Sequence, residues 1–238
     1  AWGMSQTLRT DVLVIGWGKA GKTLAGALGR AGRSVTIVEQ SAGMVGGTCI
    51  NIGCVPAKAL VHQASERRPE DDPATWFARA VDSRDALIDK LNAANRKMLD
   101  DVDAVRVVVG GRAAFTGPRT VHVTGGDDEL DVTAETVIIN TGALPRPLGV
   151  PGADGPRVHD STSIQHADPF PGSLAIVGGG PISLEFASMF AGFGAQVTVL
   201  ERGERILARE DADVAASVEQ ALAGQGVEIR TGTQVVGL

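Results

Sequence analysis

The chain contains two cysteines, and they lie close together. Cys49 and Cys54 fall within Gly-Thr-Cys-Ile-Asn-Ile-Gly-Cys-Val-Pro-Ala-Lys, residues 47–58. A disulfide between them would close a loop of about six residues and contribute about 2 kcal/mol to stability. Because such a bond stabilises a fold so little, we expect the pair to be a redox-active dithiol. The alternative is two buried thiols that never pair. The glycines around them, which suit close backbone approach, argue against that alternative.

The same order of elements occurs twice: a short apolar strand, a glycine turn, a helix, and a second strand that ends in a glutamate. The two copies span residues 11–15, 16–21, 22–31 and 34–39, and residues 173–177, 178–183, 184–193 and 196–201. In such a unit the glycines let the backbone approach a pyrophosphate at the helix N-terminus, and the acidic residue bonds a ribose. The repeat predicts two dinucleotide sites, formed by Gly16, Gly18, Gly21 and Glu39 and by Gly178, Gly180 and Glu201.

The second copy carries two features that bear on its nucleotide. Glu201 favours NAD over NADP, because a carboxylate repels a 2′-phosphate. Arg202 and Arg205 point the other way as possible phosphate partners, although both could be solvated loop charges. Ser183 stands where glycine or alanine normally allows the helix to contact the strand, so close packing is in question there. We expect NADH to be preferred.

The remaining segments complete an α/β architecture. The sequence predicts helices at 58–66, 83–102 and 213–224, a loop at 67–75, and strands at 137–139 and 227–230. Strands at 105–109, 120–123 and 130–132, with a turn at Gly125-Gly126, suggest a small antiparallel insert. The apolar residues Leu87, Leu91, Ala94 and Met98 recur at helical spacing, which favours core packing first and a partner interface second. A Pro- and Gly-rich stretch at 145–156 predicts a boundary between domains 5–150 and 151–238.

Composition excludes several classes of protein. Of the 238 residues, 43% are hydrophobic and 21% are charged, which is ordinary for a folded globular protein. The net charge of −6 argues against nucleic-acid binding, since no basic stripe is available to neutralise phosphates. No apolar run reaches the length of a membrane span, and the N-terminus lacks a signal-peptide core. We therefore expect a cytoplasmic protein, and we assign no metal ligands because lone histidines such as His62 and His159 are usually structural.

These motifs together resemble the flavoprotein pyridine nucleotide-disulfide oxidoreductases, the family of dihydrolipoamide dehydrogenase, glutathione reductase and mercuric reductase. The resemblance covers residues 9–238 and rests on the cysteine segment, on Thr141-Gly142-Ala143 and on Gly178-Gly-Gly-Pro-Ile-Ser-Leu-Glu185. The segments Gly18-Lys-Ala-Gly-Lys-Thr-Leu-Ala25, Glu39-Gln40-Ser41 and Leu60-Val61-His62 are similar to the reactive-chlorine-resistance branch of copper(II) reductases.

The resemblance implies roles for individual residues. Cys54 becomes the thiol that faces the flavin and gives a charge-transfer interaction, and Cys49 becomes the interchange thiol that meets the substrate. Lys58 would lie by the flavin and pair with Glu185, tying the two domains together. FAD would be bound by Gly16, Gly18, Ala20, Gly21, Glu39, Gln40, Gly47, Thr48, Lys58, Ala113, Thr141 and Gly142, and NAD(P)H by Gly178, Gly180, Pro181, Ile182, Glu201 and Arg202.

The implied function is FAD-mediated electron transfer from NAD(P)H through the disulfide to a disulfide, metal ion or oxidant, in a homodimer. Dihydrolipoamide dehydrogenase itself is one alternative, and a non-catalytic nucleotide-binding or redox-sensing module is another. Members of the family usually have about twice this length, with a returning flavin segment and a C-terminal dimerisation domain. We expect the chain to be a fragment that lacks this domain rather than a reduced variant, because its last strand would otherwise leave a sheet edge exposed.

Overall fold

The computed structural model describes residues 6–125 and 129–238, so the expected turn residue Gly126 lies outside the described chain. Two compact units are present. The first contains the residues up to Val55 together with Ala86–Leu144, and the second contains Pro56–Asp85 and Pro145–Leu238. One passage of the chain between the units, from Leu144 to Pro145, lies at the start of the Pro/Gly-rich stretch. Residues 56–85, however, pack with the second unit, whereas the sequence placed them in the first domain.

The first unit is built on a six-stranded sheet in the order β3-β2-β1-β6-β5-β4. Strand β1 pairs in parallel with β2 on one side and with β6 on the other, and β2 pairs in parallel with β3. Strands β4, β5 and β6 form an antiparallel meander. The strands are β1 (Gln6–Ile15), β2 (Val35–Glu39), β3 (Val105–Val109), β4 (Arg112–Gly117), β5 (Thr120–Thr124) and β6 (Leu130–Ile139).

The antiparallel insert differs from the expectation in three ways. Strand β3 is a parallel edge strand of the main sheet and not part of the insert. Strand β4 was not expected, because its residues alternate poorly and are mostly exposed. The two short strands expected at 130–132 and 137–139 are one continuous strand, β6. Pairing with β1 along its whole length explains this continuity, since Gln6 pairs with Leu130 and Ile15 with Ile139.

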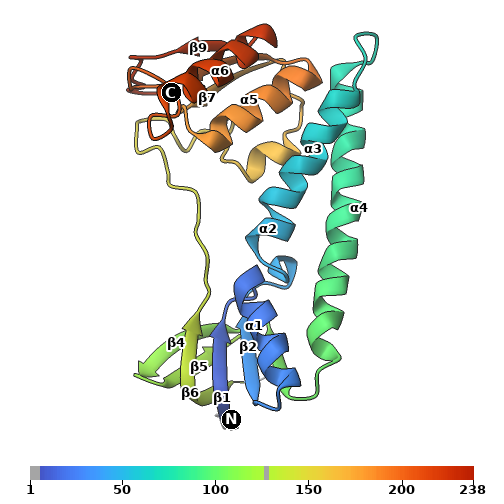
Figure 1. Cartoon of the computed structure of the whole chain (residues 1–238), viewed down its shortest axis with the longest axis vertical. Coiled ribbons are helices and arrows are strands. Elements are labelled where there is room, and N and C mark those ends of the chain that lie inside the picture. Colours follow the sequence, from blue (N-terminus) through green and yellow to red (C-terminus); the bar gives the residue numbers. More distant parts are fainter. Residues whose placement is uncertain (1–5, 126–128) are drawn as a thin grey trace. The chain divides into compact units, whose positions relative to one another are not determined.

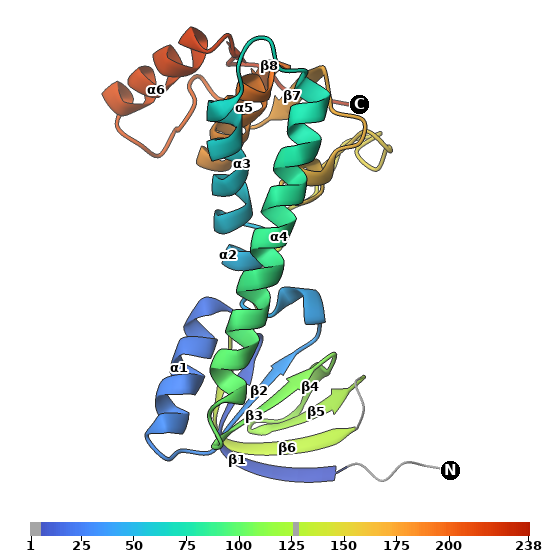
Figure 2. The same cartoon turned by 90° about the vertical axis from the view of Figure 1, so that its right-hand side faces the viewer.

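Each face of this sheet is covered by a different layer. Helix α1 (Lys19–Arg30) and the last turns of α4 (Pro73–Asp100) cover one face, where Ala25 and Leu99 meet Val14 and Ile37. Figure 2 shows α1 and this part of α4 beside the strands. On the other face the meander packs against the strand that bears Leu13. Because β1, β2 and β6 run parallel, their carboxyl ends lie at the same end of this sheet, between the two packed layers.

Helix α4 is longer than expected and buries a different face. It begins at Pro73, within the segment expected to be a loop, and it ends at Asp100. Its predicted apolar stripe is not buried in a core, because Leu87 is 38% exposed and Met98 is 45% exposed. The buried side chains on the helix instead include the polar Arg84 and Asn95. The expectation of core packing for the stripe is therefore wrong.

The second unit contains a three-stranded parallel sheet in the order β7-β8-β9. Figure 1 shows β7 and β9 of this sheet with helices α5 and α6. Its core includes an aromatic cluster in which Phe77, Phe190 and Phe193 lie with ring centroids 5.1–6.5 Å apart. The strands of this sheet and the helices between them are β7 (Ser173–Val177), α5 (Pro181–Phe193), β8 (Gln196–Leu200), α6 (Ala212–Gly224) and β9 (Glu228–Arg230). The chain also contains the helices η1 (Ala42–Met44), α2 (Thr48–Asn51), α3 (Cys54–Glu66) and η2 (Ser163–His166). No helix among the described residues is both long and apolar enough to cross a membrane.

Candidate active site

The first glycine turn joins β1 to α1 and is packed against the end of β6. Gly16 adopts φ +99°, and a Cβ there would lie 2.3 Å from the carbonyl oxygen of Asn140. The Asn140 amide donates to the Gly16 carbonyl at 3.0 Å. A Cβ on Gly21 would lie 2.7 Å from a methyl carbon of Val14, so this glycine allows the helix to contact the strand. Positions 16 and 21 therefore accept only glycine, because a Cβ at either position would clash with its neighbours.

Glu39 fastens this turn from the end of β2. It is 8% exposed, and its Oε2 accepts a hydrogen bond from the backbone N–H of Trp17 at 2.9 Å. Its Oε1 accepts from the N–H of Ser41 at 3.0 Å. A carboxylate offers about four acceptor positions, so Glu39 retains capacity for a ribose hydroxyl.

The second turn reproduces this geometry in the second unit. Gly178 adopts φ +106°, and Gly180 caps α5 with φ −85° and ψ 171°, close to the −78° and 168° of Gly18 at the start of α1. Glu201 accepts from the N–H groups of Gly179 and Gly203, both at 2.6 Å. Both turns place backbone N–H groups at a helix N-terminus, which is the arrangement that binds pyrophosphate.

The second turn leaves open space at the start of α5. A Cβ on Gly180 would meet no atom within 4 Å, so the helix N-terminus is open. Ser183 does not crowd the turn, because its Oγ lies 3.6 Å from the position of a Cβ on Gly178, which is ordinary contact. The packing question raised by Ser183 is thereby answered: the serine is accommodated.

A network of side-chain amides shapes the loop that carries the cysteines. Asn51 is 6% exposed, and its Nδ2 donates to the carbonyls of Val45 and Gly47, both at 2.9 Å. Asn92 on α4 donates to the Val45 carbonyl at 3.2 Å and to Asn51 Oδ1 at 3.0 Å. Gly47 has φ +82° and approaches the first turn so closely that a Cβ would lie 2.5 Å from Cα of Gly18. The cysteine loop is thus fixed directly beside the first nucleotide turn.

The two cysteines are free thiols in hydrogen-bonding contact. Cys49 lies in α2 and is partly buried, and Cys54 is the first residue of α3 and is exposed. The hydrogen bond to Cys54 is the largest cause that raises the pKa of Cys49, followed by burial and by the charge of Cys54, while Lys19 and Lys22 act in the opposite direction. The Cys49 thiol therefore ionises less readily than an ordinary cysteine.

Comparison with known proteins now identifies the group to which the chain belongs. The family model described as pyridine nucleotide-disulphide oxidoreductase matches residues 10–238. The chain belongs to this family. The family depends on FAD and on a pyridine nucleotide, and the residues of both turns fit such ligands. The family resemblance inferred from the cysteine segment and the two turns is confirmed.

Several named relatives share this oxidoreductase architecture. The chain is 42% identical over 220 residues to the probable pyridine nucleotide-disulfide oxidoreductase RclA of Escherichia coli strain K12, covering 92% of this chain and 48% of that protein. It is 32% identical to dihydrolipoyl dehydrogenase of Geobacillus stearothermophilus, covering 97% and 50%. A solved structure titled as the Cu(II) complex of the HOCl-induced flavoprotein disulfide reductase RclA from Escherichia coli superimposes with a TM-score of 0.88 at 41% identity, covering 96% and 50%. The chain spans about half the length of these relatives.

Other residues expected to bind FAD lie in the first unit. Ala20 is exposed in the first turn of α1, and Gln40 follows β2 and is also exposed. Thr48 lies next to Gly142, with its Oγ1 3.6 Å from the position of a Cβ on that glycine. Ala113 lies in β4 and packs in the core on the meander side of the sheet. Thr141 follows β6 and is exposed.

At the second turn, Pro181 is the first residue of α5, Ile182 is 63% exposed and Arg202 is exposed.

Lys58 and Glu185 are paired as expected, but within one unit. Lys58 Nζ on α3 donates to Glu185 Oε1 on α5. Both residues belong to the second compact unit, so the bond does not join the two units as the sequence had suggested. The Lys58 side chain is 71% exposed, and an ion pair so exposed contributes only about 0–1 kcal/mol to stability.

Sequence reasoning missed the polar residues that support the site. Asn140, Asn92, Asn95 and Lys22 make the contacts that hold the turn and the cysteine loop, yet none was assigned a role. The spacing of Asn92 and Asn95 in the middle of a long helix was a signal that could have found them, since two neighbouring amides on one helix face favour a buried polar contact.

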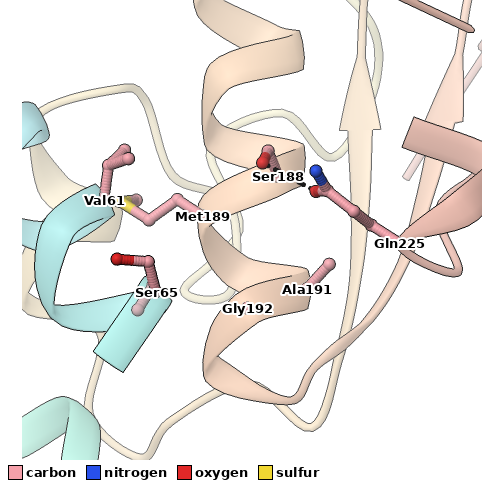
Figure 3. Close-up of a pocket in the computed structure, with 8 residues that line it drawn as sticks. Val61, Ser65, Ser188, Met189, Ala191, Gly192 and Gln225 are labelled. Atoms are coloured by element: carbon pink, nitrogen blue, oxygen red, sulfur yellow. Dashed lines mark hydrogen bonds between the residues drawn. The ribbon is translucent and has the colours of Figure 1, made fainter. Parts of the chain in front are cut away.

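The second unit also contains a pocket of about 350 Å³ that none of these residues lines. Figure 3 shows Val61 and Ser65 from α3 opposite Met189 and Ser188 from α5. Ser188 Oγ donates to Gln225 Oε1 at 2.7 Å along the pocket wall. The lining is largely apolar, and none of the described residues that form it carries a charged side chain.

Proposed function

We propose that the protein is an FAD-dependent oxidoreductase that passes two electrons from NAD(P)H to the Cys49–Cys54 disulfide and then to an acceptor. A bound FAD would supply the two-electron relay between the nicotinamide and the disulfide. Uptake of two electrons and one proton breaks the S–S bond and leaves one thiol and one thiolate. The pKa of Cys49 is raised, chiefly by the hydrogen bond to Cys54, which favours the protonated form of the Cys49 thiol.

A single observation carries this proposal. The loop leading to Cys49 abuts the first nucleotide turn, since a Cβ on Gly47 would lie 2.5 Å from Gly18 Cα. A dithiol held this close to a turn suited to a dinucleotide can exchange electrons with a ligand bound there. A surface dithiol unconnected with a cofactor would not require such a close approach.

Anaerobic titration of the intact protein with NADH tests the proposal. After two electrons per chain we expect a long-wavelength band and the appearance of two thiols per chain, and with further NADH we expect loss of flavin absorbance. Cys54→Ser should lack the band, whereas the matched variant Cys49→Ser should retain it, because its remaining thiolate still faces the flavin. Bound flavin with no NADH-dependent gain of thiols would show that the dithiol lies outside the electron path.

Glu201 supports NADH as the electron donor. Its carboxylate is held at the end of β8 by two backbone N–H groups, where it would meet the ribose and repel a 2′-phosphate. Arg205 is engaged locally, with Nη2 donating to the carbonyl of Ala208 at 3.0 Å. Arg202 is exposed and is the residue that would favour NADPH, as a possible partner for its 2′-phosphate.

For the acceptor we propose a disulfide, a metal ion or an oxidant that reacts at Cys49, in a homodimer. The relative in Escherichia coli whose structure is titled as a Cu(II) complex supports a metal ion such as copper. Dihydrolipoamide oxidation is the second candidate, favoured by relatives named dihydrolipoyl dehydrogenase. Steady-state turnover with Cu(II) and with lipoamide separates the two.

A further inference from the structure

Lys22 is a buried cation that the reaction scheme above does not use. It lies on α1 and is 8% exposed. Its Nζ donates to Oδ1 of Asn95, a neutral amide on α4. Burying an ammonium group is costly unless its charge is used or compensated. Burial is the largest cause that lowers the pKa of Lys22, followed by the charge of Lys19, and the neutral amide of Asn95 supplies no compensating negative charge.

Asn95 is itself held in one orientation. It is 6% exposed, and its Nδ2 donates to the carbonyl of Leu91 at 2.7 Å, one turn earlier on α4. Its Oδ1 is thereby directed at Lys22. Turning the amide over would place an NH₂ group against the ammonium and lose both hydrogen bonds.

The same amide packs against the loop that carries Cys49. A Cβ on Gly46 would lie 3.3 Å from Cγ of Asn95, and Gly46 has φ +94°. Gly47 abuts Gly18 on the opposite side. Asn95 therefore contacts both the cation and the loop, which fixes Cys49 relative to Lys22.

We propose that Lys22, held by Asn95, is a positioning residue that keeps Cys49 able to ionise, so that Cys49 can act as the nucleophile toward the acceptor. This inference rests on the proposed function, in which Cys49 is the interchange thiol. Thiolates and not thiols are the reactive form in such exchange.

The charges around Cys49 agree with this role. From α1, Lys19 and Lys22 both lower the pKa of Cys49, against the raising effects of Cys54 on α3 and of burial. Helix α4 presents the neutral Asn95. Lys19 is exposed, so dissolved salt screens its effect, whereas the buried Lys22 is screened much less. The effect that persists at high salt should be that of Lys22.

The test measures the pH midpoint of iodoacetamide alkylation of Cys49 in the intact protein carrying Cys54→Ala. The protein is reduced chemically, so the result does not depend on NADH or on any acceptor. Measurements are made at about 0.02 M and about 0.5 M salt, where the Debye lengths are roughly 20 Å and 4 Å. A failure of the electron path would leave this titration unchanged, so the two proposals fail separately.

Lys22→Met should raise the midpoint at both salt concentrations, with alkylation at pH 7 roughly three- to tenfold slower. Lys22→Arg, which keeps the charge, should restore the midpoint. The matched control Lys19→Met, an exposed lysine one turn earlier on α1, should raise it only at low salt. A purely structural role for Lys22 would lower stability without moving the midpoint.

Asn95→Asp provides a second variant with almost unchanged shape. Its carboxylate would offset the charge of Lys22, and the midpoint should rise at both salt concentrations even if Lys22→Met fails to fold. The proposal is overturned if Asn95→Asp leaves the midpoint unchanged, if Lys22→Met shifts it only at low salt, or if Lys22→Arg shifts it as much as Lys22→Met.

Discussion

Glu39 and Glu201 make the same pair of hydrogen bonds in the two units. In each case one carboxylate oxygen accepts from the backbone N–H of the residue between the first two glycines of the turn, which is Trp17 for Glu39 and Gly179 for Glu201. The other oxygen accepts from the N–H two residues after the glutamate. Each glutamate therefore builds the turn and keeps lone pairs free for the ribose hydroxyl that we propose it binds. The internal repeat is preserved down to these individual contacts.

We expect Glu201→Gln to weaken both the turn and the preference for NADH. Glutamine keeps one acceptor oxygen but places an NH₂ group against a backbone N–H, which should lower the free energy of unfolding by about 1–3 kcal/mol. Loss of the negative charge should shift the ratio of NADH to NADPH affinity toward NADPH. Denaturant unfolding and binding titrations measure the two effects, with the exposed Glu204→Gln as control. An unchanged affinity ratio would contradict the role assigned to Glu201.

Gly47→Ala should disrupt the contact between the cysteine loop and the first turn. The residue has φ +82°, and its Cβ would lie 2.5 Å from Gly18 Cα, where neither backbone can yield easily. We expect a loss of about 1–3 kcal/mol or more of stability, together with loss of bound flavin. Gly43→Ala is the matched control, because its Cβ would lie 3.8 Å from Ser41 Oγ. Equal flavin content in both variants would argue against the close approach.

Gly180→Ala should separate binding from folding. Gly180 has φ −85° and open space around its Cβ position, so the thermal midpoint should not fall. The added methyl group would instead occupy the space where the pyrophosphate approaches, and NADH affinity should drop about tenfold or more, a loss of roughly 1.4 kcal/mol. Gly224→Ala, also in open space at the end of α6, should leave the affinity unaltered. Wild-type affinity in Gly180→Ala would place the nucleotide elsewhere.

Replacement of Cys54 should change the pH dependence of the reduced protein. The hydrogen bond to Cys54 is the largest cause of the raised pKa of Cys49, so Cys54→Ala should lower the pH midpoint of Cys49 alkylation. In the reduced wild type the folded pKa of Cys49 lies above its unfolded value. The folded state then binds more protons, and this contribution to stability is present at low pH and lost as pH rises through the folded pKa. Denaturant unfolding from pH 7 upward should show a steeper alkaline loss in wild type than in Cys54→Ala, and equal slopes would count against the thiol pairing.

The local backbone geometry of the site could be predicted from the sequence because it depends on short segments. Gly16, Gly178 and Gly47 all adopt positive φ, which glycine tolerates and other residues rarely adopt. The glutamates at the strand ends follow a fixed distance after the turns, and the two cysteines are separated by a single tight loop. Patterns of this length carry their own geometry, so the repeated strand–turn–helix unit could be identified correctly, while the redox role of Cys49 and Cys54 stays a prediction.

Tertiary structure decided the features that depend on distant partners. The apolar residues Leu87 and Met98 suggested the buried face of α4, yet the cysteine loop and α1 lie against Asn92 and Asn95. Periodicity shows that a helix has distinct faces, but which face is buried depends on what packs there. Similarly, β3 joins β2 in parallel, although its apolar run would suit either direction of pairing.

The division of the chain into two units shows most clearly which features local sequence patterns do not predict. The sequence by itself determined two nucleotide turns, their acidic partners and the dithiol, because each is written within a few adjacent residues. Only the fold decided that residues 56–85 pack with the second unit and that Lys58 pairs with Glu185 inside it. It also decided that the charge of Lys22 is buried and held by Asn95. These are contacts between segments far apart in the chain, whose free energy depends on packing that no local pattern encodes.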